Sequence, residues 1–331
     1  MKLIATMTRY LSAVLLLSRS FGFVVQNQVT VSKLAKNGIC SKVRSKCSLE
    51  MKNGEDFTPP EPKKFYVRPD NIPNIATAAV PAVLRLGSGV FVKGYQFGFE
   101  DIVEGDEGEY NFVRVGGKKL VEKGTTMTNK PEKPLEIYEF ESCPFCKKVR
   151  EAVHIFDLDV VFYPCPKDGP TYRPKVEEMG GKAQFPYLVD PNTGVSMYES
   201  DDIIKYIADT YGDGEIPGSV SGGITTALSA GIGGIFRIGK GSQYVSAKPA
   251  NKPIEIWGYE GSPFVKVVRE ALVELEIPHF YHTTARGSTT RQELKDRTGI
   301  FQVPYIEDPN TGVKMFESAE IVEYLTTTYK A

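Results

Sequence analysis

The chain has 331 residues, of which 41% are hydrophobic and 24% charged, and its net charge is −1. This length leaves room for two modest domains with connectors, and the apolar content is ordinary for globular cores. Because acidic and basic residues nearly balance and no basic block is present, the composition argues against a nucleic-acid partner. The five cysteines do not suggest the framework of a small secreted protein, and they suit a reducing compartment with one reactive pair.

The first 50 residues have the composition of a targeting segment. They carry Lys and Arg but no acidic residue before Glu50, and a short apolar run at Leu11–Leu17 follows a basic start. This run is too short to span a membrane, which takes about 20 apolar residues. Residues 1–50 resemble the bipartite presequence, a signal peptide followed by a transit-like segment, of algae with secondary plastids. We therefore predict a plastid (chloroplast) destination, with the mitochondrion as the alternative, and loss of Cys40 and Cys47 on processing.

Two Gly- and Ala-rich segments follow, residues 51–134 and the connector 213–253. They share a pattern that occurs at Ala78–Gly89 and again at Ala227–Gly241. The first segment is longer by an insertion near residues 95–128, whose alternating run Tyr110–Val115 predicts a small hairpin. Residues 216–236 lack charge, but their many glycines disfavour a membrane-spanning helix, so membrane contact is not favoured and packing against the neighbouring domains is expected.

The rest of the chain is an internal repeat, residues 135–212 and 254–331. The separation between matching positions is nearly constant, which indicates a duplication. The matching stretches are Ile137–Phe145 with Ile256–Phe264, Val149–Ala152 with Val268–Ala271, Phe185–Val195 with Val303–Val313, and Glu199–Ser200 with Glu317–Ser318.

Each repeat predicts the same order of elements, strand-helix-strand-helix-strand-strand-helix. Apolar spacing and turn residues define them in the first repeat. The predicted strands are 135–140, 160–163, 187–189 and 195–198, and the predicted helices are 144–156, 171–179 and 200–211. Ser200 is expected to cap the last helix. The predicted fold class is therefore α/β, with two tandem βαβαββα domains.

Cys143 and Cys146 lie where the first strand of the first repeat turns into a helix. Unpaired backbone N–H groups at a helix N-terminus favour the thiolate, so Cys143 is the candidate nucleophile and Cys146, one turn along, the candidate resolving thiol. The alternative is a buried pair without chemistry. Lys147, Lys148 and Arg150, on the same helix, are expected to be solvated charges.

The residues Cys143-Pro144-Phe145-Cys146, Pro186 and Glu199-Ser200 resemble the glutaredoxin and glutathione S-transferase N-terminal domain group. The first repeat is also similar to the thioredoxin-like part of the membrane-associated prostaglandin E synthase family. The resemblance implies the thioredoxin fold for both repeats. In the first repeat it implies that one glutathione molecule is held by two pairs of residues. Phe185 and the cis-proline Pro186 would pair with its backbone, and Glu199 with Ser200 would hold its glutamyl carboxylate. A simple turn proline and simple helix capping are the alternatives, and Cys165 is expected to be a spectator.

The second repeat has lost both sulfurs, because Ser262 and Val265 replace the two cysteines. The resemblance implies a possible second site, at which the Ser262 hydroxyl acts as in some glutathione transferases. Its other members would be Val303, Pro304, Glu317 and Ser318. The chain ends at Ala331, directly after the last predicted helix, so no C-terminal all-helical transferase domain is expected to supply a second-substrate pocket. We therefore predict that the second repeat is degenerate, a structural or glutathione-binding partner.

The functional hypothesis is a glutathione-linked thiol–disulfide oxidoreductase of glutaredoxin type. Glutathione would be the cosubstrate, and disulfides or glutathionylated proteins the substrates. One alternative is a non-catalytic scaffold that binds glutathione or a protein, and another is a glutathione-dependent transferase or isomerase. An iron–sulfur cluster held by Cys143 with glutathione is possible but not favoured, and the scattered histidines predict no metal site.

Overall fold

The computed structural model describes most of the chain after residue 56. The described ranges are 57–63, 66–125, 129–223, 226–227, 229–231, 237 and 239–331. The predicted presequence, with Cys40 and Cys47, lies outside the described residues, as does part of the uncharged stretch 216–236. The chain divides into two compact units, Met1–Glu50 and Met51–Ala331, and everything below concerns the second unit.

Both repeats fold in the predicted order, which confirms the fold class. The first repeat consists of β4 Leu135–Glu139, α3 Pro144–Ile155, β5 Val160–Pro164, α4 Tyr172–Gly180, β6 Tyr187–Val189, β7 Ser196–Met197 and α5 Ser200–Tyr211. The second repeat consists of β8 Ile254–Gly258, α7 Pro263–Glu274, β9 His279–Thr283, α8 Thr290–Thr298, β10 Tyr305–Glu307, β11 Lys314–Phe316 and α9 Ser318–Tyr329. Alternating apolar residues of the strands and one apolar face of each long helix form a shared core.

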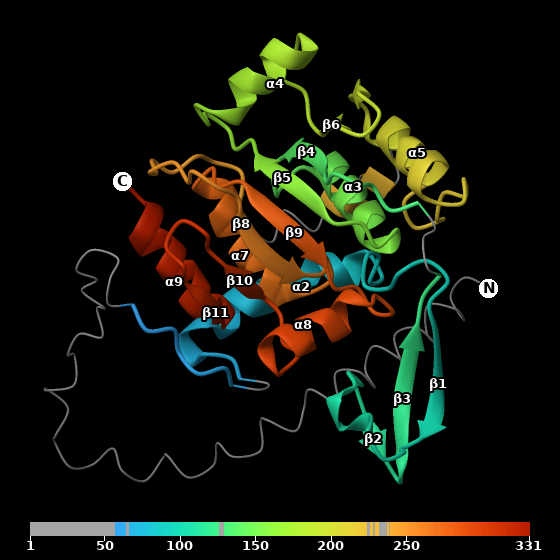
Figure 1. Cartoon of the computed structure of the whole chain (residues 1–331). Helices are drawn as coiled ribbons and strands as arrows, with labels where there is room; N and C mark the ends of the chain where they lie inside the picture. Colours follow the sequence, from blue (N-terminus) through green and yellow to red (C-terminus); the bar gives the residue numbers. More distant parts are fainter. Residues whose placement is uncertain are drawn as a thin grey trace, which may run out of the picture. The chain divides into compact units, whose positions relative to one another are not determined.

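The two repeats share one eight-stranded sheet, with the order β11-β10-β8-β9-β5-β4-β6-β7 (Figure 1). Within each repeat the first two strands are parallel, β4 with β5 and β8 with β9. The repeats are joined by antiparallel pairing of β5 with β9, in which Val160 lies opposite Tyr281 and Phe162 opposite His279. Each of these strands would be an exposed edge in an isolated repeat, so the pairing satisfies the backbone groups of both.

The charged residues of α3 lie between the repeats rather than in water. Lys147, Lys148 and Arg150 are all buried, with exposed fractions of 5%, 0% and 0%. The expectation of solvated charges is therefore wrong. The physical reason for Lys147 and Arg150 is that they face the second repeat, whose Glu260 accepts hydrogen bonds from Lys147 Nζ at 2.6 Å and Arg150 Nε at 3.2 Å. Lys148 Nζ lies 2.5 Å from Asp201 Oδ1, at the start of α5.

The ion pairs between the repeats follow the duplication. We call Glu139, Glu141, Arg150, Glu260 and Arg269 the charge cluster; all five are buried. Corresponding residues make corresponding pairs between the repeats, Lys147 with Glu260 at 2.6 Å and Lys266 with Glu141 at 2.7 Å. The segments that precede the repeats add a second matched set, Arg85 Nε with Glu151 at 3.0 Å and Arg237 Nε with Glu270 at 2.8 Å. Glu139 breaks the symmetry, because Arg150 and Arg269 both donate to it and its counterpart in the second repeat is Gly258.

The segment before the first repeat contains η2 Pro69–Asn71, α2 Ile72–Leu84 and a separate three-stranded antiparallel sheet. Its strands are β1 Gln96–Asp101, β2 Arg114–Val115 and β3 Lys118–Lys123, in the order β1-β3-β2, with η3 Asp106–Gly108 between β1 and β2. Figure 1 shows β1 and β3 as long strands standing away from the eight-stranded sheet. The predicted hairpin is thus present but larger, since Tyr110–Val115 contributes only β2. Gly116 and Gly117 both have positive φ, as a tight hairpin turn between β2 and β3 requires.

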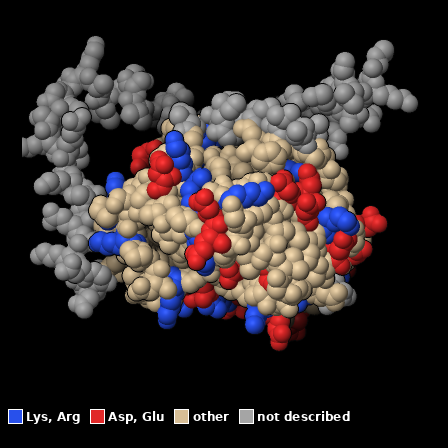
Figure 2. Space-filling model, turned by 90° about the horizontal axis from the view of Figure 1, so that it is seen from above, with Lys and Arg blue, Asp and Glu red and all other residues tan. Residues whose placement is uncertain are grey.

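The surface agrees with the balanced composition. Figure 2 shows one face of the molecule, on which Lys and Arg side chains are interspersed with Asp and Glu around a broad uncharged area. That face offers no continuous basic surface of the kind that binds nucleic acid. Among the described residues, none of the helices is both long and apolar enough to cross a membrane.

Candidate functional site

Cys143 occupies the N-cap position of α3, directly before Pro144. Its Sγ accepts a hydrogen bond from the backbone N–H of Cys146 at 3.2 Å. Both thiols are free and buried, with exposed fractions of 5% for Cys143 and 1% for Cys146. The sequence thus folds into the predicted strand-to-helix turn, and the first sulfur lies at the positive end of the helix dipole.

The two thiols have opposite pKa shifts. The hydrogen bond with the Cys146 side chain lowers the pKa of the Cys143 thiol below its ordinary value of 9.0, and the Cys146 backbone N–H lowers it further against the effect of burial. Burial raises the pKa of the Cys146 thiol well above that value. A thiolate at Cys143 beside a protonated Cys146 is the arrangement that a nucleophile and a resolving thiol require.

Phe185 and Pro186 lie beside Cys143, and the peptide bond between them is cis. The Cys143 Sγ is 4.0 Å from the Phe185 carbonyl oxygen. The Phe185 ring meets the Phe140 ring edge to face, with centroids 6.0 Å apart, and the Arg173 guanidinium lies 4.8 Å from the Phe185 ring centroid. Three predicted residues, Cys143, Phe185 and Pro186, are therefore brought together.

Glu199 and Ser200 begin α5, but not in the predicted way. Ser200 is the first residue of the helix and Glu199 holds the N-cap position, with no side-chain capping hydrogen bond. The expectation that Ser200 caps the helix is wrong, because the cap lies one residue earlier. Glu199 has a positive φ of 66°, a conformation that non-glycine residues rarely adopt, and its Oε1 accepts a hydrogen bond from Gln184 Nε2 at 2.5 Å. Capping of α5 by the Ser200 side chain therefore does not account for the Glu199-Ser200 sequence at this position.

The space next to Cys143 is small and basic. A cavity of about 10 Å³, enough for roughly one water molecule, touches Cys143. Its lining includes four cationic side chains, Lys147, Arg237, Lys240 and Lys266. Glu141 faces the same space. Three of these cations are already paired with buried carboxylates, Lys147 with Glu260, Arg237 with Glu270 and Lys266 with Glu141, and the cavity itself admits no large group.

The second repeat reproduces the backbone of this site without its sulfurs. Ser262 is the N-cap of α7, and its Oγ accepts a hydrogen bond from the Val265 N–H at 3.4 Å. The Val303–Pro304 bond is cis, and Glu317 has a φ of 74°. The Glu317 Oε1 accepts hydrogen bonds from Gln302 Nε2 at 2.9 Å and from the Lys63 N–H at 2.7 Å.

A cavity of about 620 Å³ opens at this second site. Val303, Pro304, Glu317 and Ser318 of the predicted second site line it, whereas Ser262, with an exposed fraction of 3%, is not among its described lining residues. The other wall was not predicted from the sequence, and it comes from the insertion before the first repeat: Tyr110, Asn111, Phe112 and Arg114. The alternating pattern of that insertion predicted its strands, but nothing in the pattern indicated which repeat it contacts.

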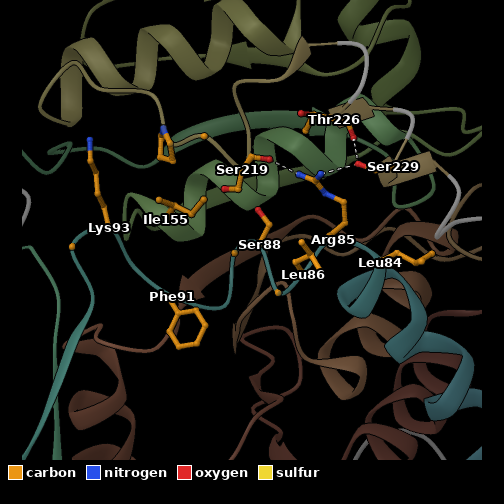
Figure 3. A pocket seen from close by; sticks show the side chains of 15 residues that line it. Leu84, Arg85, Leu86, Ser88, Phe91, Lys93, Ile155, Ser219, Thr226 and Ser229 are labelled. Atoms are coloured by element: carbon orange, nitrogen blue, oxygen red, sulfur yellow. Dashed lines mark hydrogen bonds between the residues drawn. The ribbon is translucent and has the colours of Figure 1, made fainter. Parts of the chain in front are cut away.

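Another cavity, of about 690 Å³, lies between the loop after α2 and the segment after α5 (Figure 3). Figure 3 shows Arg85 beside Ser219 and Ser229, and the Arg85 guanidinium donates to the Ser219 carbonyl at 2.7 Å and to Ser229 Oγ at 2.8 Å. Neither Cys143 nor Cys146 is among the described residues that line it, so this cavity is separate from both predicted sites.

The described residues contain no group of three or more His, Cys, Asp or Glu side chains arranged to hold a metal ion. His154 and His279 are buried in the core near β9, and burial lowers their pKa values to about 4 and about 3. Cys165 is fully buried at the end of β5, and burial raises its pKa well above the ordinary thiol value. A buried, protonated thiol of this kind is a poor nucleophile.

The βαβαββα order and the cis-prolines define both repeats as thioredoxin-like domains, and the first repeat also has the helix-capping thiol. The family model described as glutathione S-transferase, N-terminal domain, matches residues 137–215 and again residues 257–331. The chain therefore carries two tandem domains of the glutathione S-transferase N-terminal family.

Similar solved structures are also glutathione transferases. One from Bombyx mori, solved alone and in a complex with GTT, is 24% identical, with a TM-score of 0.23 over 25% of this chain and 38% of that chain. A trimeric glutathione transferase of Leishmania is 13% identical, with a TM-score of 0.21 over 60% of this chain and 68% of that chain. This chain thus spans well under half of the Bombyx enzyme. None of the curated proteins matches the chain.

Proposed function

We propose that the first repeat is a glutathione-linked thiol–disulfide oxidoreductase of glutaredoxin type. The observation that carries this proposal is the pairing of a thiol of lowered pKa, Cys143, with a buried thiol of raised pKa, Cys146, on the first turn of α3. Thiolate character at the first position provides the nucleophile, and the second position holds a proton until it is needed.

The reaction consists of two exchanges. The Cys143 thiolate attacks the glutathione sulfur of a glutathionylated protein, a sulfur–sulfur bond forms, and the protein leaves as a thiolate that takes up a proton. A second glutathione thiolate then attacks the mixed disulfide and leaves as glutathione disulfide, which restores Cys143. With a protein disulfide as substrate, Cys143 forms a mixed disulfide with one of its sulfurs, Cys146 attacks that bond and the substrate leaves as a dithiol. Two glutathione molecules then reduce the Cys143–Cys146 disulfide and leave as glutathione disulfide. Electrons come from glutathione in both cases.

Glutathione binding is supported by the family match and by two features of the first repeat. The Phe185 backbone, next to Cys143, offers a strand-like partner to an extended peptide. The N-terminus of α5 at Ser200 offers backbone N–H groups to a carboxylate. Because Cys143 is only 5% exposed, the preferred substrate is a sulfur at the end of a thin, flexible peptide rather than a disulfide on a rigid protein surface.

The test is deglutathionylation of a peptide, with glutathione and glutathione reductase supplied. We expect Cys143→Ser to reduce the rate to background, because the nucleophile is lost. Cys146→Ser should keep most of the deglutathionylation rate and lose the reduction of a protein disulfide, which needs both thiols. Wild-type activity no higher than background would overturn the proposal, and Cys165→Ser is the matched control because that thiol is buried.

A second candidate function is favoured by the cavity of about 620 Å³ in the second repeat. There, glutathione would bind without reaction, since Ser262 cannot form a disulfide. Calorimetric titration of Cys143→Ser protein with glutathione measures this binding. Glu317→Ala should weaken the interaction and Glu199→Ala should not, if the second repeat holds the peptide. The opposite pattern would assign binding to the first repeat.

A plastid location is also a proposal, supported by the composition of residues 1–50. A fusion of these residues to a fluorescent protein tests it in an alga with a secondary plastid, and mitochondrial fluorescence would contradict it.

A further inference from the structure

The insertion before the first repeat contains a long, open edge strand. In the order β1-β3-β2, β1 pairs with β3 on one side, and no described strand pairs with its other side (Figure 1). β1 has six residues, whereas the other edge strands of the two described sheets, β2, β7 and β11, have two, two and three. A short edge offers another chain few backbone groups, so β1 lacks a protection that the other edges have.

The backbone of β1 presents hydrogen-bonding groups at this open edge. Ile102 directly follows the strand, and its N–H donates to the Gly117 carbonyl of the β2–β3 turn at 2.9 Å, so its backbone groups face β3. Because the N–H and C=O groups of successive residues alternate in an antiparallel strand, those of Phe97, Phe99 and Asp101 face the open edge. An added strand can therefore bond to β1 at these alternate positions.

The side chains of β1 do not block the edge. All six residues are exposed, and Phe97 and Phe99 have exposed fractions of 66% and 58%. The strand contains neither Lys nor Pro, the residues that commonly keep an exposed edge from pairing. An edge with open backbone groups and exposed rings is a surface that pairs with another strand.

A second copy of β1 is the complementary partner. When two β1 strands lie antiparallel about a two-fold axis through Gly98, Phe97 of each copy lies opposite Phe99 of the other. These are residues whose backbone groups face outward, so each such pair exchanges two hydrogen bonds. The opposing rings also stabilise the contact, because aromatic side chains on opposite positions of neighbouring strands lie within reach of each other.

The charges of β1 favour the same register. With the axis at Gly98, Glu100 lies opposite Gln96 of the other copy, and no carboxylate lies directly opposite another. An axis at Glu100 would place its two carboxylates opposite each other, which is unfavourable. An axis at Phe99 would keep one ring pair and place the Asp101 carboxylate opposite an aromatic ring. The register centred on Gly98 therefore satisfies both the rings and the charges.

We propose that β1 is the interaction surface through which two copies of this chain associate, joining their three-stranded sheets into one continuous sheet. The association is weak and reversible, since a single edge strand buries less area than a standard interface. The insertion lies outside residues 137–215 and 257–331, the ranges that match the family model, so this surface belongs to the added segment and not to the family domains. The inference requires neither Cys143 nor glutathione.

The first test is sedimentation velocity of the full chain at about 1 to 200 µM, the range in which a small interface dissociates. We expect the mean mass to rise with concentration from that of one chain, 36.6 kDa, toward twice that value. Phe99→Lys should weaken the association by about tenfold or more, because it places a charge among the paired rings. Val83→Lys is the matched control, since it adds the same charge at an exposed apolar residue of α2.

The second test is a cysteine cross-link at the proposed axis. Opposite residues of a non-hydrogen-bonded pair have Cα atoms about 4.5 Å apart, a separation that a disulfide can span. Gly98 is not among the glycines with positive φ, and a Cβ added there meets no atom within 4 Å beyond its chain neighbours. We therefore expect Gly98→Cys to form, on mild oxidation, a disulfide between two chains, identified by mass spectrometry. Gly108→Cys, an exposed position of the same insertion outside β1, is the control.

The two tests fail independently of the thiol proposal, because Cys143→Ser protein should associate as the wild type does. A mass of one chain at every concentration, or equal effects of Phe99→Lys and Val83→Lys, would overturn the inference. So would cross-linking through residue 98 that is no faster than through residue 108, since the second copy would then bind elsewhere. Melting temperatures show whether Phe99→Lys keeps the fold, and the cross-link at Gly98→Cys decides the question if it does not.

Discussion

The described cavity beside the thiols of the first repeat is narrow, whereas the second repeat, which lacks those thiols, borders a wide one. Cys143 touches a cavity of about 10 Å³, and the cavity of about 620 Å³ lies beside Val303 and Pro304, with Ser262 not among its described lining residues. The backbone is not the cause. Cys143 and Ser262 both cap a helix, with φ and ψ of −72° and 122° against −82° and 118°. The duplicated domains therefore differ in their sulfur atoms and in the segments that cover each site.

The covering segments come from outside the repeats. Near Cys143 the lining includes Pro81 of α2, together with Ala230 and Arg237 of the connector. At the second site the insertion stands against α8 and leaves a wide cavity beside Val303. After a duplication, identical domains can diverge through their connectors while the fold of each is kept.

The comparison is tested most strongly by returning the sulfurs to the second repeat. Ser262→Cys with Val265→Cys, made in the Cys143→Ser protein, should restore thiol–disulfide exchange from background to a measurable rate, because the capping geometry is the same in both repeats. The measurement is the glutathione-dependent deglutathionylation assay, with the Cys143→Ser protein as its control. If the rate stays at background while the new pair can be oxidised to a disulfide, access rather than sulfur separates the two repeats.

The next largest effect is expected at the contact between the repeats. Arg269 is 1% exposed and donates to Glu139 at 2.5 Å and to Glu141 at 3.1 Å, so Arg269→Met leaves buried carboxylates with fewer partners. We expect a loss of about 3–5 kcal/mol in the free energy of unfolding.

The control is Lys205→Met, which removes an exposed ion pair with Asp209 and should cost about 0–1 kcal/mol. Urea denaturation of both variants measures the difference. Equal losses would mean that the charge cluster contributes no more than a surface pair.

Acid should weaken the same contact. Burial alone would raise the pKa of Glu141, but Arg150, Lys266 and Arg269 lower it to about 2 from 4.5, and the pKa of Glu260 is lowered too. A carboxyl group whose pKa is lower in the folded than in the unfolded chain stabilises the fold fully above its unfolded pKa. For Glu141 this contribution is lost as the pH falls from about 4.5 toward 2.

Buried His154 and His279 widen the pH range over which acid destabilises the fold. Their pKa values of about 4 and about 3 lie below the ordinary 6.5, so protonation below pH 6.5 favours the unfolded chain. Stability should therefore begin to fall below about pH 6.5 and continue to fall to about pH 2. Melting temperatures measured across this range check the trend, and a stability that is constant from pH 7 to 4 would contradict it.

The smallest expected effect is a shift in the pH profile of alkylation. Because the pKa of Cys143 is below 9.0, its reaction with iodoacetamide should reach half its maximal rate at a lower pH than that of an unstructured cysteine peptide. Mass spectrometry of the labelled peptide identifies Cys143 specifically. A midpoint at or above that of the peptide would show that burial outweighs the Cys146 hydrogen bonds.

The features that could be predicted from the sequence are those encoded by short local motifs that occur in both repeats. Alternating strands, the Cys-Pro-Phe-Cys turn and the duplicated Pro and Glu-Ser positions predicted both domains and brought Cys143, Phe185 and Pro186 together. Local patterns could not indicate that Lys147 and Arg150 are buried, since charges at helical spacing usually face water. Burial there depends on β5 pairing with β9, which is a contact between distant segments.

The second site shows the same limit. Glu317 and Ser318 were predicted from the repeat, yet the aromatic wall was not, because Tyr110 and Phe112 reach α8 only through the folded insertion. Ser200 illustrates a smaller error, in which helix capping was assigned to the residue one position beyond the true cap.

The shared sheet fixes the ratio of the two repeats in every molecule. Strands β5 and β9 join the repeats within one polypeptide, as two separate subunits would be joined in a dimer. Such a pair of subunits dissociates on dilution, whereas covalent linkage keeps the two repeats together at every protein concentration. Each molecule therefore carries the thiol turn of the first repeat and the wide cavity of the second in a one-to-one ratio, and either can change in sequence without loss of the other.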